Sequence, residues 1–218
     1  MRSLYVRVMR RVERFLHFRL FVIHTRLLDP EAPIDPVPSD CTVGVLNEPQ
    51  LLGFADPALG LTADGIRRAH ARGDVCFGYV ERGALVSYMW VATGPTPAEG
   101  GLWVRFARPY CYTYKSLTVP THRGRHLQEC LVHLSDRWRT AHGYTHNIDY
   151  IDTLNLPSIA ADRRYGNRPI GYAGYVTRRG ETIPFRTRGA KRAGFEFFVP
   201  APETDATGDR DTSHSHDR

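Results

Sequence analysis

A basic corner that contains a glycine is the part of the sequence best suited to bind an anion. Residues 119–134 read VPTHRGRHLQECLVHL and follow the strand-like run YCYTYKSLTV. A helix that begins directly after a strand presents the unpaired amides of its first turn and the positive end of its dipole. Gly124 lets the backbone approach a ligand closely, and Arg123 and Arg125 supply positive charge. The spacing predicts a phosphate site, although a solvated basic loop has the same pattern.

Alternate residues of the strand before this corner are polar or aromatic. Side chains in a regular strand alternate between its two faces, so we expect four of them to share one face. They are Tyr112, Tyr114, Ser116 and Thr118. Such a face suits acceptor binding and proton transfer, with Tyr114 the first candidate and Tyr112 the second. The alternative is a half-exposed sheet face whose tyrosines reflect β propensity.

Two aspartates lie near the carboxyl end of the next predicted strand, THNIDYID. Asp149 and Asp152 have opposite parity, so we expect them to face different sides of the sheet and not to form a catalytic pair. Asp152, at the strand tip, is the better candidate for a base or an acceptor contact. A turn cap or an arginine partner is the alternative role for each.

The elements that must position these residues alternate along the chain. LTADGIRRAHARGD is typical of a helix capped by Thr62, and VCFGYVERGALVSYMWVAT of a hairpin that turns at Arg82 and Gly83. After the corner we expect a helix to about Ala141 and then a strand. NLPSIAADRRYG predicts a short helix. The runs expected to complete the sheet are GLWVRFA, YCYTYKSLTV, RPIGYAGYVTR and GFEFFVP, which gives a mixed α/β or α+β domain.

The two ends of the chain differ from this central part. Residues 1–40 predict an amphipathic helix, a strand and a proline-rich connector, residues 41–200 the main domain, and residues 201–218 a disordered tail without large apolar side chains. The basic N-terminal helix either packs on the domain or lies on an anionic membrane or partner.

The order of elements and two local sequences resemble the GNAT superfamily of acyl-CoA-dependent acyltransferases. That family's pyrophosphate loop reads Gln/Arg-x-x-Gly-x-Gly/Ala, usually after Val-x-Pro, and RGRHLQ follows TVP here. Arg123 matches the opening residue, while His126 and Gln128 stand where the family has two later glycines. The downstream helix resembles the family's in Asn155, Ser158 and Gly166. The cofactor-binding residues that the resemblance implies are Leu117, Val119, Arg123, Gly124, Arg125, His126, Leu127, Asn155 and Ser158.

The position that often carries an acidic tyrosine in this family is Asp162. A carboxylate that is ionised at neutral pH is a poor acid for a departing thiolate. We therefore expect proton handling to fall on Tyr114, Tyr112 and Asp152.

The resemblance implies a GNAT-like fold, with a mostly antiparallel central sheet, a splayed parallel strand pair and flanking helices. It implies transfer of an acetyl or other acyl group from acetyl-CoA or another acyl-CoA to an amine or hydroxyl. The acceptor would be a small molecule or a sugar, attacking directly in a ternary complex. Backbone groups of Leu117 and Val119 would hold the thioester arm between the splayed strands.

The charge balance favours an anionic partner, since 29 Lys and Arg stand against 23 Asp and Glu, a formal charge of +6. Two other functions stay open. An acidic acyl carrier protein could supply the acyl group for a lipidic product, with the N-terminal helix docking the carrier or touching a membrane. A non-enzymatic nucleic-acid binder is disfavoured, because the basic residues do not gather in one patch interleaved with aromatic residues.

The cysteines are widely spaced and show no metal-binding pattern. We expect Cys41, Cys76, Cys111 and Cys130 to be free thiols in a reducing compartment, which points to the cytoplasm with peripheral membrane association left open. No apolar run is long enough to span a bilayer. We expect no metal, since the histidine pair in the tail, His214 and His216, has no further ligand spaced to join it. A homodimer also stays open.

Overall fold

The computed structural model describes residues 18–201, and the predicted N-terminal helix and most of the predicted tail lie outside them. The strands are β1 Phe18–Leu27, β2 Cys41–Leu46, β3 Val75–Glu81, β4 Ala84–Ala92, β5 Thr96–Pro97, β6 Trp103–Arg105, β7 Tyr110–Thr118, β8 His146–Asp152, β9 Arg168–Arg178, β10 Glu181–Arg186 and β11 Glu196–Phe198. They form a main sheet with the order β10-β9-β1-β8-β7-β4-β3-β2 and a small sheet with the order β11-β6-β5. The α-helices are α2 Glu48–Gly53, α3 Ala63–Ala71, α4 Leu127–Ala141, α5 Leu156–Arg164 and α6 Arg188–Arg192.

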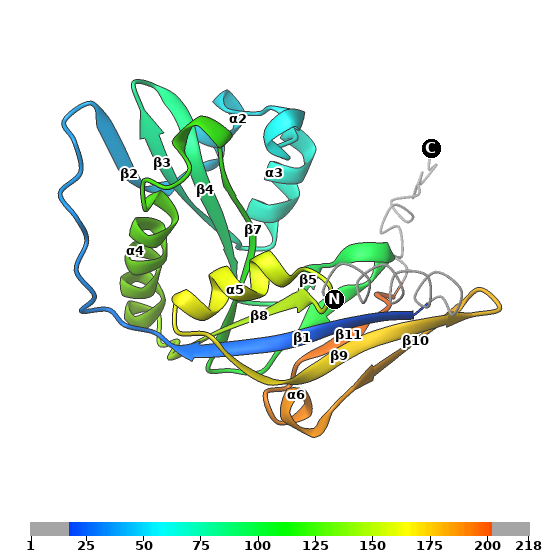
Figure 1. Cartoon of the computed structure of the whole chain (residues 1–218). Helices are drawn as coiled ribbons and strands as arrows, with labels where there is room; N and C mark the ends of the chain where they lie inside the picture. The colour runs from blue at the N-terminus through cyan, green and yellow to red at the C-terminus, as the bar shows by residue number, and fades with distance from the viewer. Residues whose placement is uncertain (1–17, 202–218) are drawn as a thin grey trace, which may run out of the picture.

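The parallel pair β7 and β8 divides the main sheet into two arms. These strands pair only through residues 110–112 and 146–148, and beyond this point β7 pairs with β4 while β8 pairs with β1. The other strand pairs of the described sheets are antiparallel. The arms therefore open away from each other (Figure 1). This confirms the predicted fold class, including the splayed pair.

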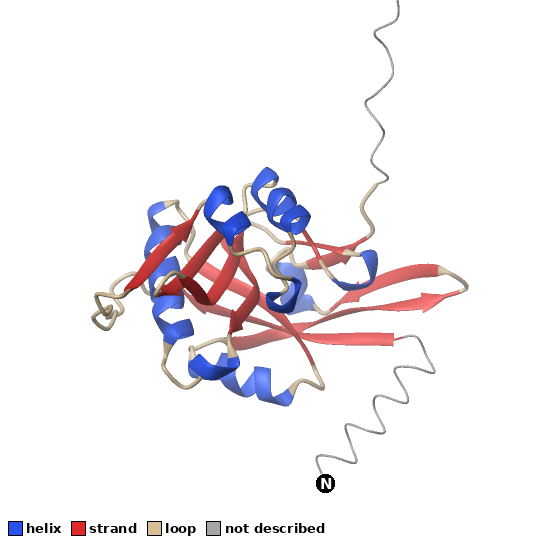
Figure 2. Cartoon of the chain, turned by 90° about the horizontal axis from the view of Figure 1, so that it is seen from above, coloured by secondary structure: helices blue, strands red, loops and turns tan. Residues whose placement is uncertain are grey.

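Helices cover both faces of the arm that contains β3 and β4. Leu51 of α2 and Ile66 of α3 are buried on one face, and Leu131 of α4 is buried on the other. Figure 2 shows helices on both sides of the strands. Local signals set the ends of these elements: the Thr62 hydroxyl accepts a hydrogen bond from the Gly65 amide, which caps α3.

Strand β1 is an interior strand of the main sheet. It lies between β8 and β9, and Phe21 and Ile23 are buried in the core. The sequence had placed this strand in a segment that precedes the domain. The boundary expected at residue 40 therefore does not separate two structural units.

Two runs predicted to extend the main sheet form a separate sheet instead. β6 and β11 pair with each other, with Val104 opposite Phe197. Both side chains are buried in the same core as Phe21 of the main sheet, so the small sheet covers one of its faces. A three-residue strand with buried aromatic side chains is stabilised more by packing on a face than by lengthening an edge.

In the described part of the chain, no helix has the length and apolar character needed to cross a membrane. The four cysteines are free, as predicted.

Candidate functional site

A cleft of about 580 Å³ opens where β7 and β8 separate. Its volume lies within the range of about 300–1,000 Å³ typical of small-molecule sites. The lining side chains from the two strands and the neighbouring helices include Tyr112, Tyr114, Gln128, Asp149, Asp152 and Asp162. The cleft therefore brings together the tyrosines of β7, the aspartates of β8 and one aspartate of α5.

A bulge in β7 shapes one wall of this cleft. Trp90 pairs with Tyr114 and Tyr88 pairs with Leu117, so Lys115 and Ser116 together face a single residue of β4. Lys115 has a φ of 48°, which is uncommon for a residue other than glycine. An extra residue of this kind bends the strand and reverses the parity of the side chains beyond it.

The bulge overturns the expectation that four alternate residues of β7 share one face. Tyr112 and Tyr114 do share a face, with stacked rings whose centroids are 5.7 Å apart. Beyond the bulge Leu117 packs in the same apolar cluster as Tyr114. Thr118 points away instead, and its hydroxyl lies 2.8 Å from that of Ser87.

The basic corner leaves a row of backbone donors at the start of α4. A short 3-10 turn, Pro120–His122, is followed by Gly124 with a φ of 77° and His126 with a φ of 58°. His126 provides no side-chain cap for α4. Among residues 18–201, no acceptor pairs with the backbone amides of residues 124–129. This is the arrangement that an anion at a helix N-terminus requires.

The two arginines of the corner differ in their partners. Arg125 donates to both carboxylate oxygens of Glu81, at 2.9 and 3.1 Å, and His122 Nε2 lies 2.6 Å from the same carboxylate. The hydrogen bonds from Arg125 and His122 lower the pKa of Glu81 to about 2. Arg123 instead donates to the carbonyl of Thr118 at 3.3 Å and makes no ion pair with the described residues. Of the two arginines, Arg123 is therefore the one whose positive charge is available to a ligand.

The Gln128 side chain is hydrogen-bonded to a backbone group of Leu117 that was expected to hold the thioester arm. Its nitrogen Nε2 donates to the Leu117 carbonyl at 2.9 Å and to the Tyr88 carbonyl at 3.0 Å. The Val119 amide donates to the Val86 carbonyl. The Leu117 carbonyl and the Val119 amide are therefore already hydrogen-bonded. The sequence showed Gln128 only as a departure from the family's loop, without a signal for this role.

The tyrosine hydroxyls are less available than the sequence indicated. Tyr114 donates to Asp74 at 2.6 Å, and an Arg72 nitrogen lies 3.4 Å from the same hydroxyl. Burial, and then the neighbouring Asp74 carboxylate, raise the pKa of Tyr114. Burial also raises the pKa of Tyr112 well above its ordinary value. Both phenols stay protonated at neutral pH, and Tyr114 directs its proton at Asp74, a partner the sequence analysis missed.

Asp152 makes both contacts that were the alternative to a catalytic role. One carboxylate oxygen lies 2.9 Å from Arg19, and the other accepts a hydrogen bond from the Leu154 amide at 2.7 Å. Asn155, which the family resemblance assigned to cofactor binding together with Ser158, caps α5 by accepting a hydrogen bond from the Ser158 amide at 3.3 Å.

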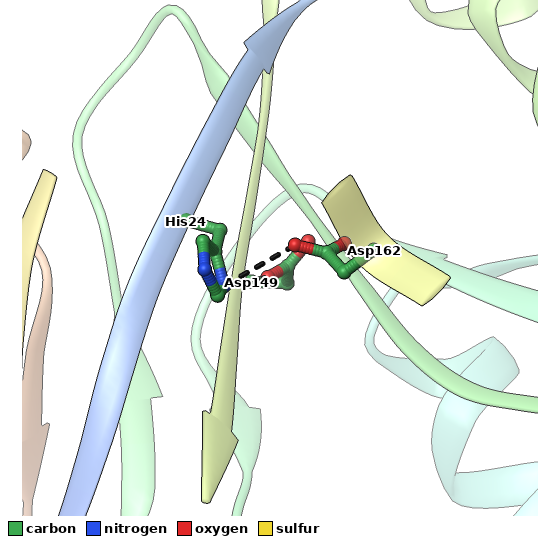
Figure 3. A group of neighbouring side chains, drawn as sticks. All are labelled: His24, Asp149 and Asp162. Carbon is green, nitrogen blue, oxygen red and sulfur yellow. Dashed lines mark ion pairs between the residues drawn. The ribbon is translucent and has the colours of Figure 1, made fainter. Parts of the chain in front are cut away.

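His24, Asp149 and Asp162 form a cluster (Figure 3), and its two aspartates line the cleft. His24 Nδ1 lies 3.2 Å from Asp162 Oδ2 and 3.7 Å from Asp149 Oδ1. The His24 side chain is fully buried, and those of Asp149 and Asp162 are 13% and 12% exposed. These are the described side chains that together could hold a metal ion. The sequence analysis missed His24, because it lies in a segment read as preceding the domain.

Burial changes the ionisation of this cluster. It raises the pKa of Asp162 to about 6, and burial with the adjacent Asp162 raises the pKa of Asp149 well above its ordinary value. Burial and then the charge of Arg163 lower the pKa of His24. Asp162 therefore holds its proton more strongly than an ordinary aspartate does.

No family model matches the chain, and no curated protein matches it. Among solved structures it is similar to a Drosophila protein, with 15% identity, a TM-score of 0.53, and coverage of 80% of this chain and 57% of the other. It is also similar to a GCN5-related N-acetyltransferase from Sphaerobacter thermophilus, with 12% identity, a TM-score of 0.50, and coverage of 82% and 55%. A putative GNAT-family acetyltransferase from Novosphingobium aromaticivorans matches with 16% identity, a TM-score of 0.49, and coverage of 73% and 63%. The matches span between about half and two thirds of these chains, and the one to the Sphaerobacter structure shows that the molecule has the GNAT fold.

Proposed function

We propose that this chain, which has the fold of the GCN5-related N-acetyltransferases, is an acyltransferase that uses acyl-CoA. The observation that carries the proposal is the cleft between β7 and β8, which opens beside the uncapped, basic start of α4. Acyl-CoA with its phosphates at the start of α4 could place its acyl group in the cleft, beside the second substrate, without crossing the sheet.

The corner fits the pyrophosphate of coenzyme A. The amides of residues 124–129 offer several donors, and Arg123 offers an unpaired positive charge. Charge-assisted hydrogen bonds to phosphate are stronger than neutral ones, and the helix dipole adds to them. In this proposal Arg125 adds little while Glu81 neutralises it.

The far end of the cleft favours an amine as the acceptor. Asp152 lines the cleft, and Arg19 contacts Asp152 at 2.9 Å and Glu99 at 3.0 Å, so these three side chains together carry a net negative charge. A cationic small molecule or amino sugar is attracted to such a site. We assign Asp152 the role of contacting the acceptor amine.

The reaction is aminolysis of a thioester. The amine nitrogen attacks the carbonyl carbon, the C–N bond forms, the C–S bond breaks, and the proton lost by the amine ends on the sulfur of the leaving thiolate. Holding the two reactants together supplies a large part of the acceleration. Because Tyr114 directs its hydroxyl at Asp74, we assign it to shaping the acceptor side of the cleft.

Binding of acetyl-CoA and release of its thiol in the presence of a panel of amines test this function. We expect acetyl-CoA to raise the melting temperature, and Arg123→Glu to weaken binding about 10- to 100-fold, as loss of a charge-assisted contact does. Arg67→Glu, the same change on the exposed surface of α3, is the matched control. Absence of binding, or equal binding by both variants, would contradict the proposal.

The same assay separates the other donors and partners that the sequence left open. An acyl group on an acidic acyl carrier protein is compared with acyl-CoA at equal concentration, and a hydroxyl acceptor with its amine analogue. Retention on DNA that falls steeply with salt, without thiol release, would favour a nucleic-acid binder instead.

A further inference from the structure

We propose that His24, Asp149 and Asp162 bind a divalent metal ion, for which Zn²⁺ is the best fit. The donor atoms come from three elements far apart in sequence, β1, β8 and α5, and converge on one point (Figure 3). His24 Nδ1, Asp149 Oδ1 and Asp162 Oδ2 take part, and the donor atoms of the three residues lie within 4.8 Å of one another. Imidazole with carboxylates is a donor set that Zn²⁺ accepts.

The separations of the His24 ring nitrogen from the two carboxylates fit a shared ion better than direct hydrogen bonds. Ligands about 2.0–2.2 Å from a tetrahedral zinc lie about 3.3–3.5 Å from each other. His24 Nδ1 lies 3.2 Å from one carboxylate oxygen and 3.7 Å from the other. A charge-assisted hydrogen bond would be about 2.7–2.9 Å long, and neither contact has hydrogen-bond geometry.

The donor atoms are buried and unsatisfied in the described chain. His24 Nδ1, Asp149 Oδ1 and Asp162 Oδ2 have no hydrogen-bond partner there, and His24 is fully buried. Buried polar atoms almost always have a partner, and two carboxylates held together out of water repel each other. A cation at their common point would satisfy all three atoms together.

Neighbouring amides orient the carboxylates toward that point. Asn147 donates to Asp149 Oδ2 at 3.0 Å, and Asn167 donates to Asp162 Oδ1 at 2.6 Å. In each aspartate the second oxygen is thus held from behind while the first stays free. The orientation of Asn147 is fixed in turn, because its own oxygen accepts from the buried Arg139 at 3.0 Å. Metal sites depend on outer hydrogen bonds of this kind to aim their ligands.

The site leaves room for a fourth ligand on the side of the cleft. Asp149 and Asp162 line the cleft, whereas the His24 side chain is fully buried and does not line it. Three protein ligands with one open position are the arrangement of zinc sites that bind a substrate or water. We infer that this position takes an oxygen or nitrogen atom of a small molecule in the cleft.

A bound ion would also hold α5 against the sheet. None of the residues of α5 is buried, and Asp162 is its contact with β1. Metal binding should therefore stabilise the fold, which provides a readout independent of catalysis. The proposal does not depend on the acyl donor, so it can fail while the proposed acyltransferase function stands.

The test uses the full-length protein, purified without a histidine tag, incubated with Zn²⁺ and then desalted. We expect about one equivalent of zinc by elemental analysis, a higher melting temperature that chelation by EDTA reverses, and visible absorption bands when Co²⁺ replaces Zn²⁺. Asp162→Asn should reduce the retained metal at least about 10-fold, and His24→Asn should do the same if circular dichroism shows that it folds.

Glu129→Gln is the matched control, because Glu129 is another carboxylate in contact with imidazoles, those of the exposed His126 and the partly buried His133. It should retain the metal. The proposal is overturned if the wild-type protein retains no zinc, or if Asp162→Asn retains as much as wild type. It is also overturned if an infrared band of a protonated carboxyl group, lost in Asp162→Asn, persists in the presence of Zn²⁺, since the pair would then share a proton instead.

Discussion

The Arg125 guanidinium donates two hydrogen bonds to the Glu81 carboxylate, one to each oxygen, at 2.9 and 3.1 Å. Glu81 ends β3, and Arg125 immediately precedes the uncapped start of α4, so this pair joins the β3–β4 hairpin to the basic corner. A carboxylate placed here competes with any anionic ligand for Arg125. The pair therefore limits how much positive charge the corner offers.

Glu81→Gln should increase the affinity for acetyl-CoA about 3- to 10-fold, because it frees the charge of Arg125 at an exposed site where water and salt weaken the effect. Isothermal titration calorimetry measures the gain, which should shrink as salt is added. Asp40→Asn, which removes the carboxylate paired with Arg82 at the same hairpin, should leave affinity unchanged. A loss of affinity in Glu81→Gln would show that the carboxylate supports the corner rather than limiting it.

The stability of the protein should depend on Glu81 at acid pH. Its pKa is lowered from 4.5 to about 2, so the folded state gains stability from this group above its ordinary pKa. That gain is lost as the pH falls from about 4.5 to about 2. Denaturant titrations across this range should show the difference between wild type and Glu81→Gln shrinking toward low pH. Glu31→Gln, at an exposed carboxyl group, should run parallel to wild type throughout.

Tyr114→Phe should lower kcat less than about 10-fold, because the Tyr114 hydroxyl already donates to Asp74 and is not free to protonate a thiolate. A Tyr114→Phe enzyme without turnover in assays at saturating acyl-CoA would restore the hydroxyl as the acid.

Asp152→Asn should raise KM for the amine more than it lowers kcat, since we assign Asp152 to acceptor binding. Steady-state assays at saturating acyl-CoA separate the two constants.

Local sequence signals were sufficient for most elements of the fold. Thr62 predicted the start of a helix through the capping preference of its side chain, and the turn residues Arg82 and Gly83 predicted a hairpin. The splayed strand pair was predicted from a family resemblance. By contrast, nothing in the sequence marks the bulge at Lys115, because this lysine adopts a conformation that usually selects glycine.

The parts of the candidate site that could not be predicted depend on contacts between distant segments. His24 meets Asp162 only because β1 enters the sheet beside β8 and α5 crosses near it. The ionisation of Asp162 depends on burial, which a motif does not reveal. Gln128 was recognised only as a departure from a glycine pattern, because its role depends on carbonyl groups of two other strands.

The position of β1 also sets the order in which a newly synthesised chain can fold. This strand emerges from the ribosome before the other described strands, yet its partners are β8 and the strand that runs to Arg178, with Phe18 opposite Val176. At about 5–20 residues per second, β1 waits roughly 8–30 s for its second neighbour. During that interval its apolar side chains, Phe21 among them, are without their native cover. The arm of the sheet that contains β1 can therefore close only after β9 has been made, so the first of the described strands must wait for the ninth.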